Sequence, residues 1–126
     1  MNRLFNQFFS SLERGKVVLF GKVAIGGSGA ATINAVKSKG ILSVAKNSTG
    51  NYTITLNDIY VDMYSCDIKF LGSSDPGVAY TYTVSQAVNT TKAIVIQCKD
   101  NSGAAVDPAS GSEMQIEIKL KSSTAP

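Results

Sequence analysis

Apolar and polar positions alternate with a period of two over most of the chain. The clearest run is 114–121, where Met, Ile, Ile and Leu alternate with Gln, Glu, Lys and Lys. Such alternation predicts a strand with one face in the core and the other in water. Comparable runs cover 16–25, 40–45, 52–56, 66–70, 78–84 and 94–98. Short strands at this spacing predict an all-β fold, a single β-sandwich or jelly-roll-like domain over residues 16–126.

Several local features refine this prediction. Residues 46–56 read as a hairpin, because Gly50 and Asn51 can supply the positive φ that its tip needs. Asn57 is a plausible cap for a short helical turn over 58–64. We also expect hydroxyl side chains of the runs 52–56 and 78–85 to face solvent. These are Thr53, Thr55, Thr81, Thr83 and Ser85.

Residues 1–15 follow a different period. Their apolar side chains recur at helical spacing with Asn and Ser on the opposite face, which predicts a short amphipathic helical arm ending at Gly15. The segment lacks the uninterrupted apolar stretch of a secretion signal. A helix this short is not stable alone, so it must pack on its own domain or insert into a neighbouring subunit or larger scaffold. The candidate contact residues are Arg3, Leu4, Phe5, Phe8, Phe9, Leu12, Arg14 and Lys16.

Charge is unevenly distributed along the chain. Residues 1–46 contain seven basic residues and one acidic residue, a net charge of +6, whereas the remainder contains five basic and eight acidic residues, a net charge of −3. This asymmetry fits contact with an acidic protein surface, with nucleic acid or with a membrane. Because no run of consecutive Lys and Arg occurs and the arm has few basic residues, we expect neither a nucleic-acid nor a membrane partner.

The residues needed for common enzyme chemistry are missing. The chain has no His, which removes Ser-His-Asp and Cys-His catalysis and His-containing zinc sites. Gly26–Gly29 lacks the Lys-Ser/Thr ending of a phosphate-binding loop, and no acidic pair stands out as catalytic. Cys66 and Cys98 lie in strand-like runs and are expected to be free core thiols, although they could pair if their strands are neighbours. We therefore expect no catalytic site, no cofactor and no metal.

Three segments carry a resemblance to a known family. Residues 39–56, 92–98 and 107–123, which include Gly-Asn-Tyr-Thr-Ile-Thr-Leu and Asp-Pro-Ala-Ser-Gly, resemble small virion structural proteins of tailed bacteriophages and are most similar to head decoration, or cement, proteins. The resemblance implies a compact β-domain, commonly a homotrimer, that bridges major capsid protein subunits. It also implies synthesis in the host cytoplasm and a place on the capsid surface of the virion. It supplies no catalytic residues.

Two other functions remain open from the sequence. A tail, fibre or cell-surface β-sandwich protein would bind a receptor or glycan through exposed aromatic side chains on loops, for which Tyr60 and Tyr64 are the candidates. A small hydrolase is disfavoured, because no catalytic constellation is apparent.

Overall fold

The computed structural model describes residues 16–72 and 75–121. These residues form two antiparallel four-stranded sheets, with strand orders β2-β1-β8-β5 in sheet A and β3-β4-β7-β6 in sheet B. The arm expected over residues 1–15 lies outside the described residues. The strands are β1 (Lys16–Ile25), β2 (Ala31–Ile33), β3 (Ile41–Ser48), β4 (Asn51–Leu56), β5 (Asp62–Leu71), β6 (Tyr80–Ala87), β7 (Ala93–Lys99) and β8 (Glu113–Lys121). The predicted all-β class is therefore confirmed.

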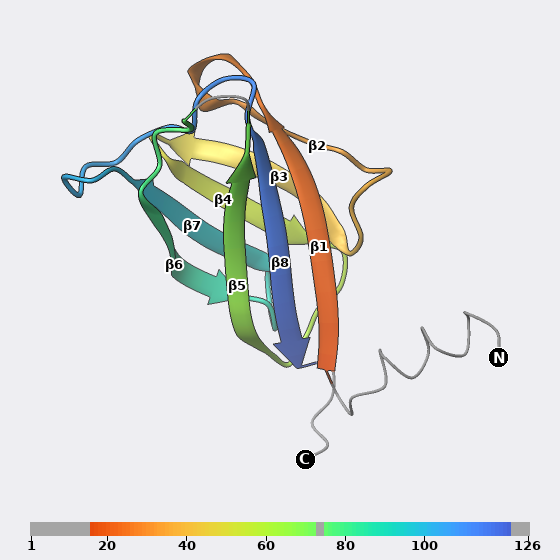
Figure 1. Cartoon of the computed structure of the whole chain (residues 1–126). Coiled ribbons are helices and arrows are strands. Elements are labelled where there is room, and N and C mark those ends of the chain that lie inside the picture. The colour runs from red at the N-terminus through yellow and green to blue at the C-terminus, as the bar shows by residue number, and fades with distance from the viewer. Residues whose placement is uncertain (1–15, 73–74, 122–126) are drawn as a thin grey trace, which may run out of the picture.

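The two sheets face each other, and the strands of sheet B run across those of sheet A (Figure 1). One hydrophobic cluster joins them, because alternate side chains of β1 and β8 meet alternate side chains of β4 and β7. Tyr52, Ile54 and Leu56 of β4 are completely buried, as the alternation in their run predicts. This cluster is the core that holds the two sheets together.

Strand β8 is the centre of sheet A. Its residues pair with β1 on one side and with β5 on the other, over almost its whole length. Met114, Ile118 and Leu120 are fully buried, which confirms the inward face read from the sequence. Lys16 and Lys121 are cross-strand partners, so β1 starts where β8 ends.

The predicted hairpin is confirmed as β3 and β4. Gly50 lies at its tip with φ 67°, and an added Cβ there would lie 2.5 Å from the carbonyl oxygen of Val106. Asp107 accepts hydrogen bonds from the Gly50 amide at 2.7 Å and from Lys46 Nζ at 2.8 Å. The hairpin tip is thereby fixed to the loop between β7 and β8.

A second bond ties the loop after β1 to the core. The buried Tyr52 hydroxyl donates to the Gly29 carbonyl at 2.6 Å. Burial, with the nearby charge of Asp107, raises the pKa of Tyr52, so the hydroxyl stays protonated and able to donate. Gly27–Gly29 forms a single 3-10 turn here, and β2 follows it. The alternation of the sequence did not predict β2, because this strand has only three residues.

The helical turn predicted over 58–64 is wrong. Residues 57–61 contain no helix, and β5 already begins at Asp62. The Tyr60 amide donates to the Val88 carbonyl at 2.9 Å and the Val61 amide to the Lys121 carbonyl at 2.8 Å. Pairing with these more distant segments replaces the local bonds that a helix would need.

The outward orientation predicted for Thr81 and Thr83 of β6 is also wrong, whereas Ser85 is exposed as predicted. Thr81 lies opposite Cys98 and Thr83 opposite Ile96, both in the core, so the two Thr side chains face inward. Tyr80, Tyr82 and Val84 are instead exposed, at 49%, 46% and 51% of the accessible surface of each residue. A stripe of large side chains therefore lies on the outside of sheet B.

Candidate interaction surface

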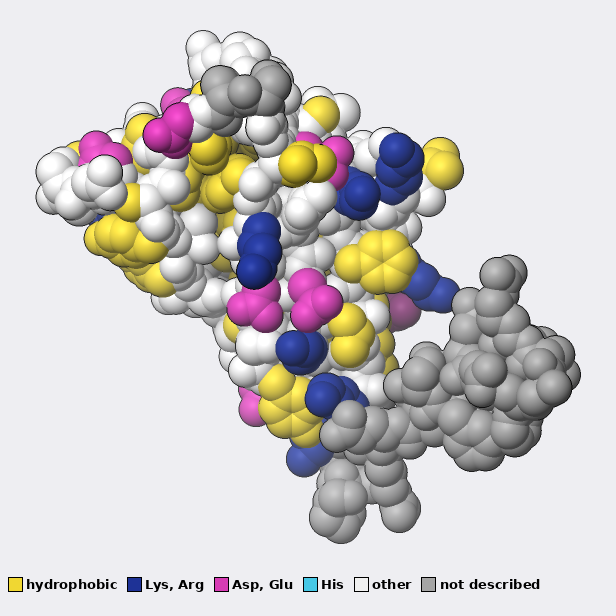
Figure 2. Space-filling view, viewed as in Figure 1, with side chains coloured by type: hydrophobic (Ala, Val, Ile, Leu, Met, Phe, Trp, Pro, Cys, Tyr) yellow, Lys and Arg dark blue, Asp and Glu magenta, His cyan; other side chains and the backbone are white. Residues whose placement is uncertain are grey.

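The outer face of sheet A combines charged and hydrophobic side chains. Val18 and Phe20 of β1 are 44% and 48% exposed, although a strand covered on one face needs no apolar residues on the other. Figure 2 looks onto this face and shows hydrophobic side chains lying among those of Lys, Asp and Glu. The neighbouring charged residues on the same face are Lys22, Asp67, Lys69, Glu113, Glu117 and Lys119.

An open groove of about 520 Å³ crosses this face, lined by parts of β1, β5 and β8. Phe20 supplies an apolar wall, and Asp67 and Glu117 lie directly opposite each other on β5 and β8. Like charges facing each other across strands destabilise a sheet slightly. Lys119 Nζ lies 3.4 Å from Glu117 Oε1 and relieves part of this repulsion. The groove can therefore accept an apolar side chain together with donor groups of a partner protein.

The charge separation seen along the sequence does not become a separation in space. Lys22 Nζ lies 3.8 Å from Glu113 Oε1 across β1 and β8, and Lys46 is bonded to Asp107. Basic residues of the first 46 positions therefore lie beside acidic residues of the last 30. Among the described residues, the outer face of sheet A therefore presents both signs of charge together.

The outer face of sheet B is nearly neutral. Asn51 Nδ2 donates to Gln97 Oε1 at 3.1 Å, and Asn47 Nδ2 donates to Asn51 Oδ1 at 2.8 Å and to Thr53 Oγ1 at 2.6 Å. The outward orientation predicted for Thr53 and Thr55 is confirmed, because they alternate along β4 with buried residues that face the core. The exposed Tyr80 and Tyr82 adjoin this polar network through β7.

The thiols and buried tyrosine do not form a reactive centre. Cys66 and Cys98 are free, as the sequence reading favoured. Burial raises the pKa of Cys66 to about 12 and that of Cys98 to about 11, with smaller contributions from Asp67 and Asp107. These shifts disfavour the thiolate, which is the reactive form. Within 16–72 and 75–121, no group of three or more Cys, Asp and Glu side chains is placed to hold a metal ion.

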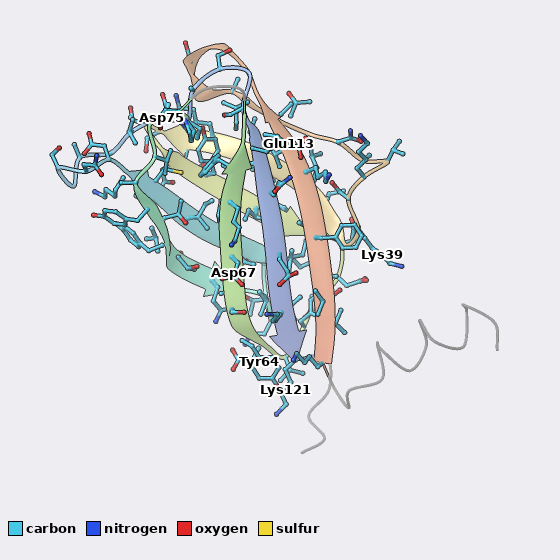
Figure 3. All side chains as sticks on the ribbon, in the orientation of Figure 1. Lys39, Tyr64, Asp67, Asp75, Glu113 and Lys121 are labelled. Carbon is cyan, nitrogen blue, oxygen red and sulfur yellow. The ribbon has the colours of Figure 1, made fainter. Side chains whose placement is uncertain are left out.

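Of the predicted contact residues, the structure places only Lys16. It starts β1 next to Lys121, at the end of sheet A where Figure 3 also shows Tyr64. The other seven, Arg3, Leu4, Phe5, Phe8, Phe9, Leu12 and Arg14, lie outside the described residues. Val18 and Phe20 were not singled out from the sequence. Their signal was available, because the run 17–20 is apolar at every position rather than at every second one.

The described part of the chain contains no helix that is long and apolar enough to cross a membrane. In comparisons with known proteins, no family model, curated protein or solved structure matches this chain.

Proposed function

We propose that this protein is a non-enzymatic virion structural protein that decorates a phage capsid. In this proposal a jelly-roll-like sandwich, as a homotrimer, bridges major capsid protein subunits and stabilises the shell. The observation that carries the proposal is the pair of exposed hydrophobic residues, Val18 and Phe20, on the outer face of sheet A. Segment 1–15, which carries three of the five Phe residues of the chain, directly precedes the same strand, β1.

These features fit a docking surface. Contiguous apolar side chains rimmed by charge are typical of protein contacts, with aromatic residues contributing most of the binding energy. Phe20 would enter a hydrophobic pocket of the coat protein, and Lys22 and Asp67 beside it would set the orientation. Each copy can bind weakly, because several linked copies on a regular lattice bind together much more tightly than one.

A capsid-binding experiment tests the proposal. The full chain, the variant Phe20→Ser and a chain lacking residues 1–15 are mixed with expanded capsids of the phage that encodes the protein, and co-sedimentation is measured. Because Phe20 is half exposed, the substitution should leave the fold intact while lowering capsid binding at least about tenfold, as expected for an aromatic anchor. Leu42→Ser is the matched control, since Leu42 is 58% exposed on β3 of the other sheet.

The outcomes separate the parts of the proposal. Equal binding by Phe20→Ser and Leu42→Ser would show that the outer face of sheet A does not contact the capsid. Full binding by the chain lacking residues 1–15 would show that this segment is not needed for binding. No binding by the full chain to any capsid form would reject the decoration role.

A second candidate function has its own observation. Tyr80 and Tyr82 are exposed on a polar sheet face beside Gln97. Of the two tyrosines that the sequence suggested, Tyr60 is partly buried against the core, and Tyr64 is exposed but lies on β5 rather than on a loop. Screening the full chain and Tyr82→Ala against immobilised bacterial polysaccharides tests this function. Binding that Tyr82→Ala abolishes would support it, and absence of binding would reject it.

A further inference from the structure

Strand β6 is a free edge with unusual composition. It is the last strand of sheet B, and among the residues described here only β7 pairs with it. Its sequence, Tyr-Thr-Tyr-Thr-Val-Ser-Gln-Ala, contains no charged residue and no Pro, and it begins with five residues of high strand propensity. An edge of this kind offers unpaired backbone groups to another strand.

The other edges are protected in ways that β6 is not. Strand β2 has three residues, and β5 carries Asp62, Asp67 and Lys69. Strand β3 contains Lys46 and lies close to β2. Short length and charged side chains are the usual means by which soluble proteins prevent edge pairing. Strand β6 is eight residues long and has no charged side chain, which indicates that this edge is covered when the protein functions.

We propose that β6 pairs in antiparallel orientation with β6 of a second copy of this chain. A strand that pairs with itself about a two-fold axis places the residue on the axis next to its own copy and pairs every other residue with one equally far beyond the axis. A charge near the axis would therefore meet a like charge, and a strand free of charges avoids this repulsion. Strand β6 meets this condition along its whole length.

The positions of the side chains select a register. With the axis at Tyr82, that residue faces Tyr82 of the second copy, Tyr80 faces Val84, and Thr81 faces Thr83. Aromatic pairs, aromatic pairs with β-branched residues, and Thr pairs are the favourable cross-strand combinations. The two exposed Tyr stripes would then form one continuous aromatic patch across both copies. The register shift between Thr83 and Ser85 confines regular pairing to the first half of β6.

The size of this contact limits its strength. Three side chains that are each about half exposed contribute on the order of 300 Å² per copy, compared with about 800 Å² for a stable interface. We therefore expect weak, reversible association in solution. The contact does not depend on capsid decoration. In a homotrimer it would link one trimer to another, because a two-fold contact cannot build a three-fold ring.

Site-directed cross-linking tests the pairing. Tyr82→Cys is made in the full chain carrying Cys66→Ser, and treated at about 100 µM with a short bis-maleimide. The expected result is a covalent dimer that forms at least about tenfold faster than with Ala45→Cys in the same background. Ala45 is the matched control, because it is exposed on the outer face of β3, at the opposite edge of sheet B.

Sedimentation of Tyr82→Lys gives an independent measurement. A Lys at this position would face its own copy, so the concentration-dependent increase in mass should be lost while Ala45→Lys retains it. Equal cross-linking rates for the two Cys variants, or association that Tyr82→Lys leaves unchanged, would overturn the proposal. Glycan binding through Tyr82 without any cross-linking would also overturn the proposal. The same holds for a dimer that is lost on deletion of residues 1–15 while Tyr82→Cys fails to cross-link.

Discussion

Replacing Tyr52 by Phe removes one hydroxyl from the interior and nothing else. Tyr52 is completely buried, and its hydroxyl donates a 2.6 Å hydrogen bond to the Gly29 carbonyl. The aromatic ring, and hence the packing against the core, is the same in both residues. The change therefore isolates the bond between β4 and the loop after β1.

The expected loss of stability depends on the Gly29 carbonyl, which is left without its hydrogen-bond donor. A hydrogen bond contributes about 0.5 to 1.5 kcal/mol net, and a buried group that loses its partner costs about 1 to 3 kcal/mol. Since the Gly29 carbonyl loses this donor, we expect the free energy of unfolding to fall by about 2 kcal/mol. For a domain of this size the melting temperature should then fall by roughly 6 to 10 °C.

Urea unfolding followed by circular dichroism measures the difference. Tyr64→Phe is the matched control, because Tyr64 is exposed, and it should change stability by less than about 0.5 kcal/mol. Amide exchange should also accelerate at Gly26, whose amide donates to the Ala30 carbonyl at 2.7 Å, and at Ala30, whose amide donates to the Gly27 carbonyl at 3.3 Å, because both bonds lie in the same loop. A loss no larger than that of Tyr64→Phe, with unchanged exchange, would refute the idea that this bond fixes the loop.

Three further predictions concern the loops and the thiols. Gly50→Ala should destabilise more than Gly77→Ala in urea unfolding, by roughly 3 against 1 kcal/mol, since both have positive φ but only Gly50 meets backbone within 4 Å; equal losses would contradict this. Burial alone would raise the pKa of Asp107. The hydrogen bonds from Lys46 and Gly50 and the charge of Lys46 lower it by more than burial raises it, so the pKa is below its ordinary value of about 4. Its contribution to stability is complete above that pH and is lost as the pH falls through the lowered pKa, so the difference in urea midpoint between wild type and Asp107→Asn should shrink from pH 5 to pH 2; a constant difference would argue against it. At pH 8 the native thiols of Cys66 and Cys98 should react with a disulfide reagent at least about 100-fold more slowly than in urea, because their raised pKa values leave little thiolate; rapid reaction of the folded protein would show that the thiols are accessible and ionised.

Much of the fold was predictable because several strands have one apolar and one charged face. In β8 only one orientation buries Met and Ile and exposes Glu and Lys, so the pattern determines which face is inward. In β6 the pattern alternates Tyr with Thr, and both residue types fit a half-buried strand. There the register with β7, which places Thr81 opposite Cys98, decides the orientation. The pairing of Thr81 with Cys98 joins residues of two different strands, so the sequence of β6 alone does not predict it.

The candidate surface was less predictable for a related reason. Residues 58–64 have a local cap signal at Asn57, yet the backbone of Tyr60 and Val61 bonds to segments 28 and 60 residues away. Equally, the sequence does not show that pairing of β1 with β8 brings the basic Lys22 next to the acidic Glu113. Only the fully apolar run 17–20 indicated from sequence that a second face of β1 needs cover.

The central place of β8 in sheet A affects how the chain can fold during synthesis. Of the described strands, β1 is synthesised first and β8 last, and β1 and β5 each pair with β8 rather than with each other. Sheet A therefore cannot be completed until β8 has left the ribosome, and until then β1 and β5 each have an unpaired edge. The β3-β4 hairpin, which needs only neighbouring residues, can form much earlier. Chains truncated before Glu113 should accordingly be aggregation-prone, because sheet A then lacks its central strand.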